Sequence, residues 1–308
     1  MTAEKLIIGS RGSKLALWQA NHVRGSLLTR YPDLVVEVKI IKTLGDKVLD
    51  VALSRIGGKG LFTKELEQAI LSNEVDLAVH SLKDLPTDLP DGLVAGVITA
   101  RSHGNDAFVS RESLSFKELP AGSRVGTGSL RRRVQLRSLR PDLEYAELRG
   151  NVDTRLRKLD AGDYDAIVLA QAGLVRLGLE KRITEVFRAE MVIPAAGQGA
   201  LALEYREDDS NTSEMVAFLG DNKTSIEVRA ERRFLGALGG GCQVPIGVRA
   251  DLLPDGNLQI QGMIADLEGQ RLIRDNLRGS PGDDPGKILA ERMLDSGGRE
   301  LLEEIMEI

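Results

Sequence analysis

The sequence has few of the residues that build disulfides and metal sites. It holds one cysteine, Cys242, and three histidines in 308 residues. One cysteine cannot form an intramolecular disulfide or a multi-cysteine zinc site. Three histidines scattered along the chain also argue against a metal site built from histidine alone. We therefore expect no bound metal.

Aromatic residues and long apolar runs are also scarce. Phe, Trp and Tyr together make up 4% of the chain, which argues against a surface that stacks bases or sugars. No apolar run is long enough to span a bilayer, and the first nine residues lack the apolar core of a signal peptide. The apolar content of 42% and the charged content of 28% are ordinary for a globular protein. We expect a cytoplasmic protein of about two domains, or three.

The net charge of −5 hides an uneven distribution of arginine. Between residues 124 and 188 the chain has 14 Lys and Arg against 9 Asp and Glu, a local balance of +5, so the remainder carries −10. A basic region of this size inside an acidic protein favours a compact anionic ligand, because a nucleic acid usually calls for a broader basic face. For any single arginine, a solvated helix face remains the simpler interpretation.

Strand-like and helix-like segments alternate along the chain, which predicts an α/β fold. In the first part we expect strands over 5–9, 34–43, 76–82 and 93–99, a helix capped by Ser13 and a helix over 62–71. In the second part we expect strands over 124–127, 144–149 and 165–170, and helices over 129–139, over 152–159 and from Gln171 onward.

Two turn-rich joints divide the chain, one near Arg101 and one over 194–199. The segment 200–204 resembles a strand that returns to the first domain. Beyond it we expect a helix over 225–235, strands over 244–252 and 258–265, and a final helix from Pro285. The predicted domains are residues 1–100 with 195–218, residues 101–194, and residues 219–308.

A glycine-containing turn, Gly126-Thr-Gly-Ser-Leu-Arg131, leads from a predicted strand into a helix. It is not a dinucleotide-binding fingerprint, because Arg131 stands where the third glycine would be. What remains is a helix N-terminus with the hydroxyls of Thr127 and Ser129. Arg131 and Arg132 follow at once, and the combination suits a carboxylate or a phosphate. A structural helix cap explains the serine equally well.

A second motif, Val-His-Ser-Leu-Lys-Asp-Leu-Pro over 79–86, joins a strand to a turn. Pro86 cannot continue a central strand, so Lys83 and Asp84 lie near the carboxyl end of the strand, where open α/β sheets bind ligands. A lysine there can anchor an anion, and an aspartate can transfer a proton. A surface ion pair is the common alternative. His80 lies in the apolar part of the motif and is expected to be a hydrogen-bonded core histidine.

The single cysteine follows a run of three glycines over 239–241. Such a run leaves the thiol accessible, or it packs backbone closely around another group. A nucleophilic cysteine needs a histidine partner, and no histidine of this chain stands in a suitable motif. A covalent tether needs no such partner. A buried, inert cysteine is the ordinary alternative.

With these motifs in this order, the chain resembles the porphobilinogen deaminase family, also called hydroxymethylbilane synthases, from one end to the other. The matching segments are Gly-Ser-Arg-Gly-Ser-Lys-Leu-Ala-Leu-Trp-Gln (9–19), Gly-Gly-Lys-Gly-Leu-Phe (57–62), Val-His-Ser-Leu-Lys-Asp-Leu-Pro (79–86), Val-Gly-Thr-Gly-Ser-Leu-Arg-Arg (125–132), Leu-Arg-Gly-Asn-Val-Asp-Thr-Arg (148–155) and Gly-Gly-Cys-Gln-Val-Pro-Ile-Gly (240–247). The resemblance implies an α/β fold with two lobes like those of periplasmic binding proteins and a smaller C-terminal α+β domain.

The resemblance also implies a transferase of tetrapyrrole and haem biosynthesis. Such an enzyme joins four porphobilinogen molecules head to tail, releases ammonia, and uses water to free linear hydroxymethylbilane. It works as a cytoplasmic monomer, without nucleic acid or membrane, on a dipyrromethane cofactor held by a thioether to the cysteine that matches Cys242. Asp84 matches the catalytic aspartate. The residues that match cofactor-binding and substrate-binding positions are Arg11, Ser13, Lys59, Lys83, Thr127, Ser129, Arg131, Arg132, Arg149, Gly150, Arg155, Arg176 and Gln198.

This chemistry agrees with the composition. Porphobilinogen carries acetate and propionate groups, so a growing chain of pyrroles calls for many guanidinium groups. Asp84 is the only acid of the motifs placed to stabilise a cationic pyrrole and relay protons. The sequence departs from the family at Gly128, where serine is frequent, so a hydroxyl contact there is absent or replaced.

Two other classes of protein remain as alternatives. A cytoplasmic two-lobed binding protein for a small carboxylate would account for the lobes and the arginines, but it leaves Cys242 unexplained. An RNA-binding protein could use the basic region, but the few aromatic residues and the overall acidity argue against it.

Overall fold

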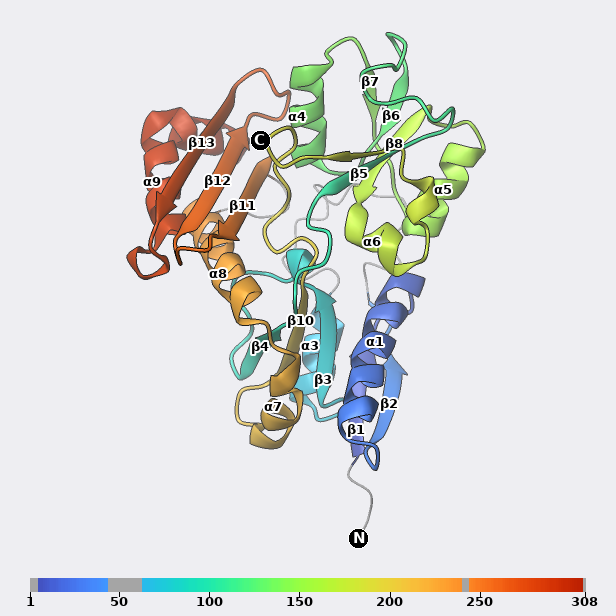
Figure 1. Ribbon diagram of the computed structural model, residues 1–308, viewed down its shortest axis with the longest axis vertical. Helices are drawn as coiled ribbons and strands as arrows, with labels where there is room; N and C mark the ends of the chain where they lie inside the picture. The colour runs from blue at the N-terminus through green and yellow to red at the C-terminus, as the bar shows by residue number, and fades with distance from the viewer. Residues whose placement is uncertain (1–4, 44–62, 240–243, 307–308) are drawn as a thin grey trace. The chain divides into compact units, whose positions relative to one another are not determined.

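The computed structural model describes residues 5–43, 63–239 and 244–306, and these form two compact units. The first unit takes residues 5–43, 63–102 and 200–225, and the second takes residues 103–199, 226–239 and 244–306. Figure 1 shows the course of the chain through both units. No helix among these described residues is long and apolar enough to cross a membrane.

The first unit contains one mixed sheet and the helices that cover it. Its strands are β1 (Lys5–Ser10), β2 (Val35–Ile40), β3 (Leu77–Ser81), β4 (Leu93–Ile98) and β10 (Leu201–Arg206). Its helices include α1 (Lys14–Arg30), α3 (Lys64–Leu71) and α7 (Ser210–Val216). The strand order is β2-β1-β3-β10-β4; β1 is parallel to β2 and β3, and β10 is antiparallel to both of its neighbours.

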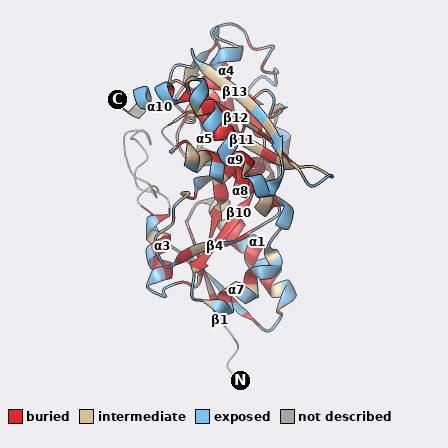
Figure 2. Cartoon of the chain, turned by 90° about the vertical axis from the view of Figure 1, so that its left-hand side faces the viewer, coloured by how far each residue is buried: buried red, intermediate tan, exposed pale blue. Residues whose placement is uncertain are grey.

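Helices pack on both faces of this sheet because side chains alternate along each strand. Leu6 and Ile8 of β1 lie in one cluster with Val23 and Leu27 of α1. Ile7, between them, packs on the opposite face against the cluster formed by α3. Figure 2 shows buried residues on the sheets and exposed residues on the outer sides of the helices.

The alternation predicted from the sequence is confirmed in this unit. The segment predicted to return from beyond residue 199 does so as β10, which lies between β3 and β4. The strand predicted over 34–43 is shorter, because its partner β1 ends at Ser10, opposite Ile40. The helix predicted over 62–71 begins at Lys64.

The second unit contains two sheets. The strands of the first are β5 (Asp106–Ser110), β6 (Arg124–Gly126), β7 (Glu144–Ala146), β8 (Ala166–Ala170) and β9 (Glu185–Phe187). Its helices are α4 (Leu130–Leu139), α5 (Val152–Asp160) and α6 (Gln171–Arg176). The strand order is β7-β6-β8-β5-β9; β6 is parallel to β7 and β8, and β5 is antiparallel to both of its neighbours. This is the topology of the first unit's sheet, with β6 in the place of β1 and β5 in the place of β10.

The other sheet of the second unit is antiparallel and has three strands in sequence order. They are β11 (Ile246–Leu252), β12 (Leu258–Ala265) and β13 (Leu272–Gly279). The accompanying helices are α8 (Asn222–Ala237), α9 (Pro285–Met293) and α10 (Arg299–Met306). Phe234 of α8, Ile260 of β12 and Leu289 of α9 belong to one buried core. The predicted class, two α/β sheets followed by a smaller α+β domain, is confirmed.

Candidate active site

In the first unit, the two predicted motifs lie at the same edge of the sheet. β1 and β3 are parallel neighbours, so Arg11 and Ser13, which follow β1, lie at the same end of the strands as Lys83 and Asp84, which follow β3. Ser13 caps α1, and its hydroxyl accepts a hydrogen bond from the backbone N–H of Ala16 at 3.2 Å. The placement at the carboxyl end of the strands agrees with the prediction.

Asp84 differs from His80 and Lys83, the other ionisable residues of its motif, in being exposed. It ends the 3-10 turn Leu82–Asp84, which the backbone bond from Leu82 N–H to Ala200 C=O ties to the sheet at 3.1 Å. Among the described residues, the Asp84 carboxylate makes no hydrogen bond and no ion pair. His80 is buried instead, with Nε2 2.8 Å from Oε2 of Glu204. The expectation of a core histidine is therefore confirmed.

In the second unit, the predicted residues follow three adjacent parallel strands. Thr127 and Ser129 follow β6, Arg149 and Gly150 follow β7, and Arg176 ends the helix that follows β8. The strand predicted over 144–149 ends at Ala146, so Arg149 lies in a loop and not in a strand. Carboxyl ends of parallel strands meet at one edge, which brings these residues to a common side of the sheet.

The hydroxyls after β6 have structural partners. Ser129 is the N-cap of α4 and accepts from the backbone N–H of Arg132 at 3.4 Å. Thr127 Oγ1 accepts from the backbone N–H of Ser129 at 3.2 Å. The helix-cap interpretation of this serine is therefore confirmed.

The loop after β7 is fixed by a turn. Gly150 has a φ of +108°, a region that favours glycine, and its carbonyl accepts from Arg155 Nε at 2.7 Å. Asn151 caps α5 by accepting from the backbone N–H of Thr154 at 3.0 Å. Arg149 pairs through Nε with Oε1 of Glu147 at 2.8 Å, and both side chains are partly exposed. The Arg149 guanidinium is therefore held at the edge of the sheet and remains in reach of solvent.

A buried carboxylate, Asp106, holds the arginine pair. Its side chain is fully buried, while Arg131 and Arg132 are 6% and 5% exposed. Arg131 Nη1 donates to Oδ2 at 2.8 Å, and Arg132 donates to Oδ1 from Nε at 3.0 Å and from Nη2 at 2.7 Å. Asp106 is not among the residues predicted from the sequence. The signal in the sequence is an aspartate at the start of a segment that is otherwise apolar, Asp-Ala-Phe-Val. A carboxylate in such a segment is expected to be buried and therefore to pair with a cationic side chain.

The charges of this cluster shift the pKa of its members. Burial alone would raise the pKa of Asp106, but the positive charges and hydrogen bonds of Arg131 and Arg132 outweigh it and lower that pKa well below its ordinary value. Burial lowers the pKa of Arg131 although Asp106 opposes this change. Asp106 is therefore ionised at neutral pH.

Arg131 and Arg132 differ in how many of their guanidinium nitrogens have a hydrogen-bond acceptor. Arg132 uses Nε and Nη2 on Asp106 and Nη1 on the Val168 carbonyl at 3.1 Å. Arg131 uses only Nη1, which also donates to the Ile193 carbonyl at 2.7 Å. Its Nε and Nη2 have no acceptor among the described residues. Two guanidinium groups against one carboxylate leave one positive charge in excess, so the cluster suits a ligand carboxylate.

Two more predicted residues lie around the joint at 194–199. Gln198 Nε2 donates to Asp106 Oδ1 and to the Gly104 carbonyl, both at 2.9 Å. Arg176 Nη2 donates to the Gly199 carbonyl at 2.7 Å, and burial lowers the pKa of Arg176 to about 10. Gln198 is thus joined to the arginine pair through Asp106, the carboxylate that both arginines contact. Lys59 and Cys242 lie outside the described residues.

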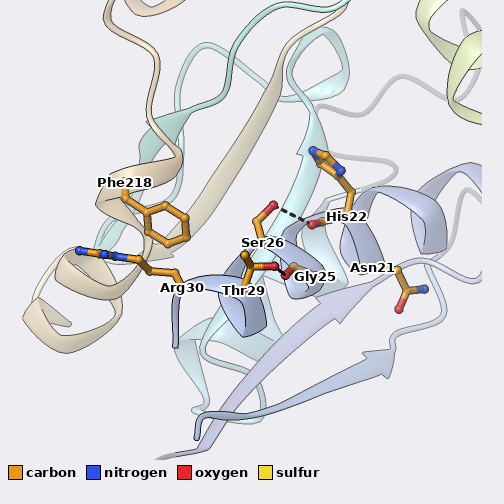
Figure 3. A pocket seen from close by; sticks show the side chains of 7 residues that line it. All are labelled: Asn21, His22, Gly25, Ser26, Thr29, Arg30 and Phe218. Carbon is orange, nitrogen blue, oxygen red and sulfur yellow. Dashed lines mark hydrogen bonds between the residues drawn. The ribbon is translucent and has the colours of Figure 1, made fainter. Parts of the chain in front are cut away.

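The predicted residues do not line the cavities found elsewhere on the first unit. An open cavity of about 620 Å³ on one side of α1 is shown in Figure 3. It is lined by Asn21, His22, Gly25, Ser26, Thr29, Arg30 and Phe218. The hydroxyls of Ser26 and Thr29 donate within α1, to the carbonyls of His22 and Gly25. Among the described residues, no group of histidine and acidic side chains could hold a metal ion.

Comparison with known proteins gives matches over nearly the whole chain. The family model "Porphobilinogen deaminase, dipyromethane cofactor binding domain" matches residues 6–214, and "Porphobilinogen deaminase, C-terminal domain" matches residues 225–295. The chain is 51% identical over 303 residues to the porphobilinogen deaminase of Nitratidesulfovibrio vulgaris, covering 97% of this chain and 96% of that one. It is 49% identical over 307 residues to the porphobilinogen deaminase of Syntrophobacter fumaroxidans, covering 99% of each.

Proposed function

The chain belongs to the porphobilinogen deaminase family and is a hydroxymethylbilane synthase, and on this premise we propose which of its residues perform the reaction. The enzyme joins four porphobilinogen molecules head to tail with release of ammonia, and water frees the linear product. A protein that only binds a small carboxylate is not favoured, because both matching family models belong to this transferase.

Asp84 is the proposed catalytic acid–base residue. The observation that carries this assignment is its exposed carboxylate, which has no partner among the described residues and lies beside Lys83 at the carboxyl end of β3. A carboxylate in this position can stabilise the positive charge that develops on a pyrrole ring. It can also take the proton that the attacking pyrrole carbon loses and give a proton to the amine that leaves as ammonia.

Arg131 is proposed to bind a carboxylate of the ligand through Nε and Nη2. Arg132 donates to the other oxygen of Asp106 through Nε and Nη2, and in this way it helps to hold the carboxylate that orients Arg131. Fork-shaped guanidinium groups match the geometry of acetate and propionate side chains. The other residues proposed to hold cofactor and substrate are Arg11, Ser13, Lys59, Lys83, Thr127, Ser129, Arg149, Gly150, Arg155, Arg176 and Gln198.

The donor set of the second unit fits a dipyrromethane, whose side chains are carboxylates. The fit rests on the excess positive charge of the buried cluster around Asp106 and on the unused donors of Arg131. When bound, this group supplies the pyrrole carbon to which the first substrate unit is joined. We propose that Cys242, the single thiol of the sequence, holds it as a thioether.

Three domains are proposed, residues 1–100 with 195–218, residues 101–194, and residues 219–308. Three separate sheets, each with buried cores of its own, support this division. We also propose that the protein works as a cytoplasmic monomer without nucleic acid. The net charge of −5 and the aromatic content of 4% support the last point.

Incubation of the purified protein with porphobilinogen tests the activity. We expect ammonia and hydroxymethylbilane in a ratio of four to one. Binding of porphobilinogen without release of ammonia would contradict the assignment and support a carboxylate-binding protein.

A further inference from the structure

A buried glutamine links the arginine pair to the third sheet. Gln135 lies one helical turn after Arg131 on α4 and is fully buried. Its Nε2 donates to the Ile193 carbonyl at 3.0 Å, and its Oε1 accepts from the Ile193 N–H at 2.8 Å. The side-chain amide thus pairs with the backbone of Ile193 as one peptide group pairs with another. Such a reciprocal pair fixes the position of the Ile193 carbonyl.

Arg274, on β13, contacts the same glutamine from the other side. Its Nη2 donates to Gln135 Oε1 at 3.0 Å and to the Met191 carbonyl at 2.8 Å, and its Nη1 donates to the Glu190 carbonyl at 2.7 Å. Among the described residues Arg274 forms no ion pair, and burial lowers its pKa. The charged side chain of Arg274 therefore donates its hydrogen bonds to carbonyl and amide oxygens, all of which belong to the 190–193 segment or to α4.

The Ile193 carbonyl is the point at which this network reaches the proposed site. It accepts from Arg131 Nη1 at 2.7 Å as well as from Gln135. Ile193 is held in place by an apolar cluster with Val134 of α4 and Met263 of β12. A continuous path of hydrogen bonds therefore runs from Arg274 through Gln135 and Ile193 to Arg131.

We propose that Arg274 is a positioning residue for Arg131. It acts through Gln135 and the Ile193 carbonyl, and this inference rests on the proposed role of Arg131 in binding a ligand carboxylate. A bond to Asp106 alone would leave the Arg131 guanidinium free to turn about that contact. The second bond, to the Ile193 carbonyl, fixes its plane, and with it the direction in which Nε and Nη2 point. The third sheet thereby sets the geometry of an arginine in the neighbouring sheet.

The variant that tests this is Arg274→Met, which keeps most of the apolar stem and removes the donors. The matched control is Arg278→Met on the same strand, because Arg278 pairs with Asp255 and, among the described residues, makes no hydrogen bond to Gln135 or to the 190–193 segment. We expect Arg274→Met to raise KM for porphobilinogen, or to lower the fraction of chains that carry dipyrromethane, by roughly tenfold, as expected for residues coupled in one network. Turnover per loaded chain should change less than twofold. Arg278→Met should change neither quantity.

A double-mutant cycle with Arg131→Lys separates positioning from simple loss of stability. If Arg274 acts through Arg131, the double variant Arg131→Lys/Arg274→Met should bind no worse than Arg131→Lys alone. Arg274→Lys, which restores a donor, should recover part of the binding. Additive effects in the cycle, or a lower Tm without any change in KM or cofactor content, would overturn the proposal. Failure of the proposed function itself would be seen separately, in a wild-type protein without product.

Discussion

Arg132 donates two hydrogen bonds to a single oxygen of Asp106, from Nε at 3.0 Å and from Nη2 at 2.7 Å. The other oxygen of Asp106 accepts from Arg131 at 2.8 Å. The carboxylate therefore serves both arginines, and among the described residues only Arg131 of the two keeps guanidinium nitrogens, Nε and Nη2, without an acceptor. The two arginines are neighbours in sequence but differ in role. Arg132 holds Asp106, whereas Arg131 can also bind a ligand carboxylate.

Lysine at the two positions should separate their roles. Arg131→Lys keeps a charge that can contact Asp106 and the Ile193 carbonyl, but it loses the unused donors. We expect nearly normal stability and weaker retention of dipyrromethane. Arg132→Lys cannot reproduce the contacts to both Asp106 and Val168, and it should cost about 1.5–3 kcal/mol of unfolding free energy. Urea unfolding and intact mass measure the two effects, and equal stability losses in both variants would contradict the division.

Asp84→Asn should fold normally and yet lose at least roughly a hundredfold in turnover, because an amide cannot take up and return a proton. Asp91→Asn, an exposed aspartate a few residues away, is the matched control and should keep wild-type turnover. The measurement is the rate of hydroxymethylbilane formation per chain that carries cofactor. Wild-type rates for Asp84→Asn would show that the acid–base group lies elsewhere.

Acid should destabilise the protein through Asp106. Its folded pKa is lowered below the ordinary value of 3.8, so its contribution to stability is present above about pH 4 and is lost as the pH falls below that value. Unfolding free energies at pH 7, 4 and 3 should decline in the wild type. Asp106→Asn should be less stable at pH 7 and show a smaller decline; an identical decline would contradict the assignment.

Gly128→Ser should destabilise this chain. A Cβ at Gly128 would lie 2.7 Å from the Leu148 carbonyl oxygen and 3.4 Å from Oε1 of Glu147. The nearer atom is backbone, so the loop that leads to Arg149 must shift. We expect a loss of about 1–3 kcal/mol together with weaker cofactor retention. Gly25→Ser, on a helix with open space around it, is the control and should have little effect on either. Unchanged unfolding for Gly128→Ser would show that the loop yields without cost.

The sequence predicts the periodic parts of this fold well. Alternating and helical spacings located most of the strands, including the return of β10 to the first unit, because these patterns are local. Two strands of the second unit, β5 and β9, were not predicted. β13 was missed because Arg274, Asp275 and Asn276 are residue types without strand preference, and their register becomes evident only beside β12.

The contacts between the site residues were harder to predict from the sequence than the identities of those residues. Positions at strand ends could be inferred for Asp84 and Ser129 from the turn residues that follow each strand. The partner of Arg131 and Arg132 could not, because Asp106 lies 25 and 26 residues before them and meets them only through the packing of β5 beside β8. Gln135 and Arg274, 139 residues apart, are further cases of contacts that no local spacing encodes.

The intact mass of the purified protein tests the central claim most directly. If Cys242 holds a dipyrromethane as a thioether, the mass should exceed that of the sequence by one such unit, and Cys242→Ser should abolish the excess. Because a thioether resists hydrolysis, the added mass should survive turnover, and porphobilinogen should produce a ladder of heavier species spaced by one deaminated pyrrole. An active wild-type protein whose mass equals that of the bare sequence would contradict both the tether and the proposed course of the reaction.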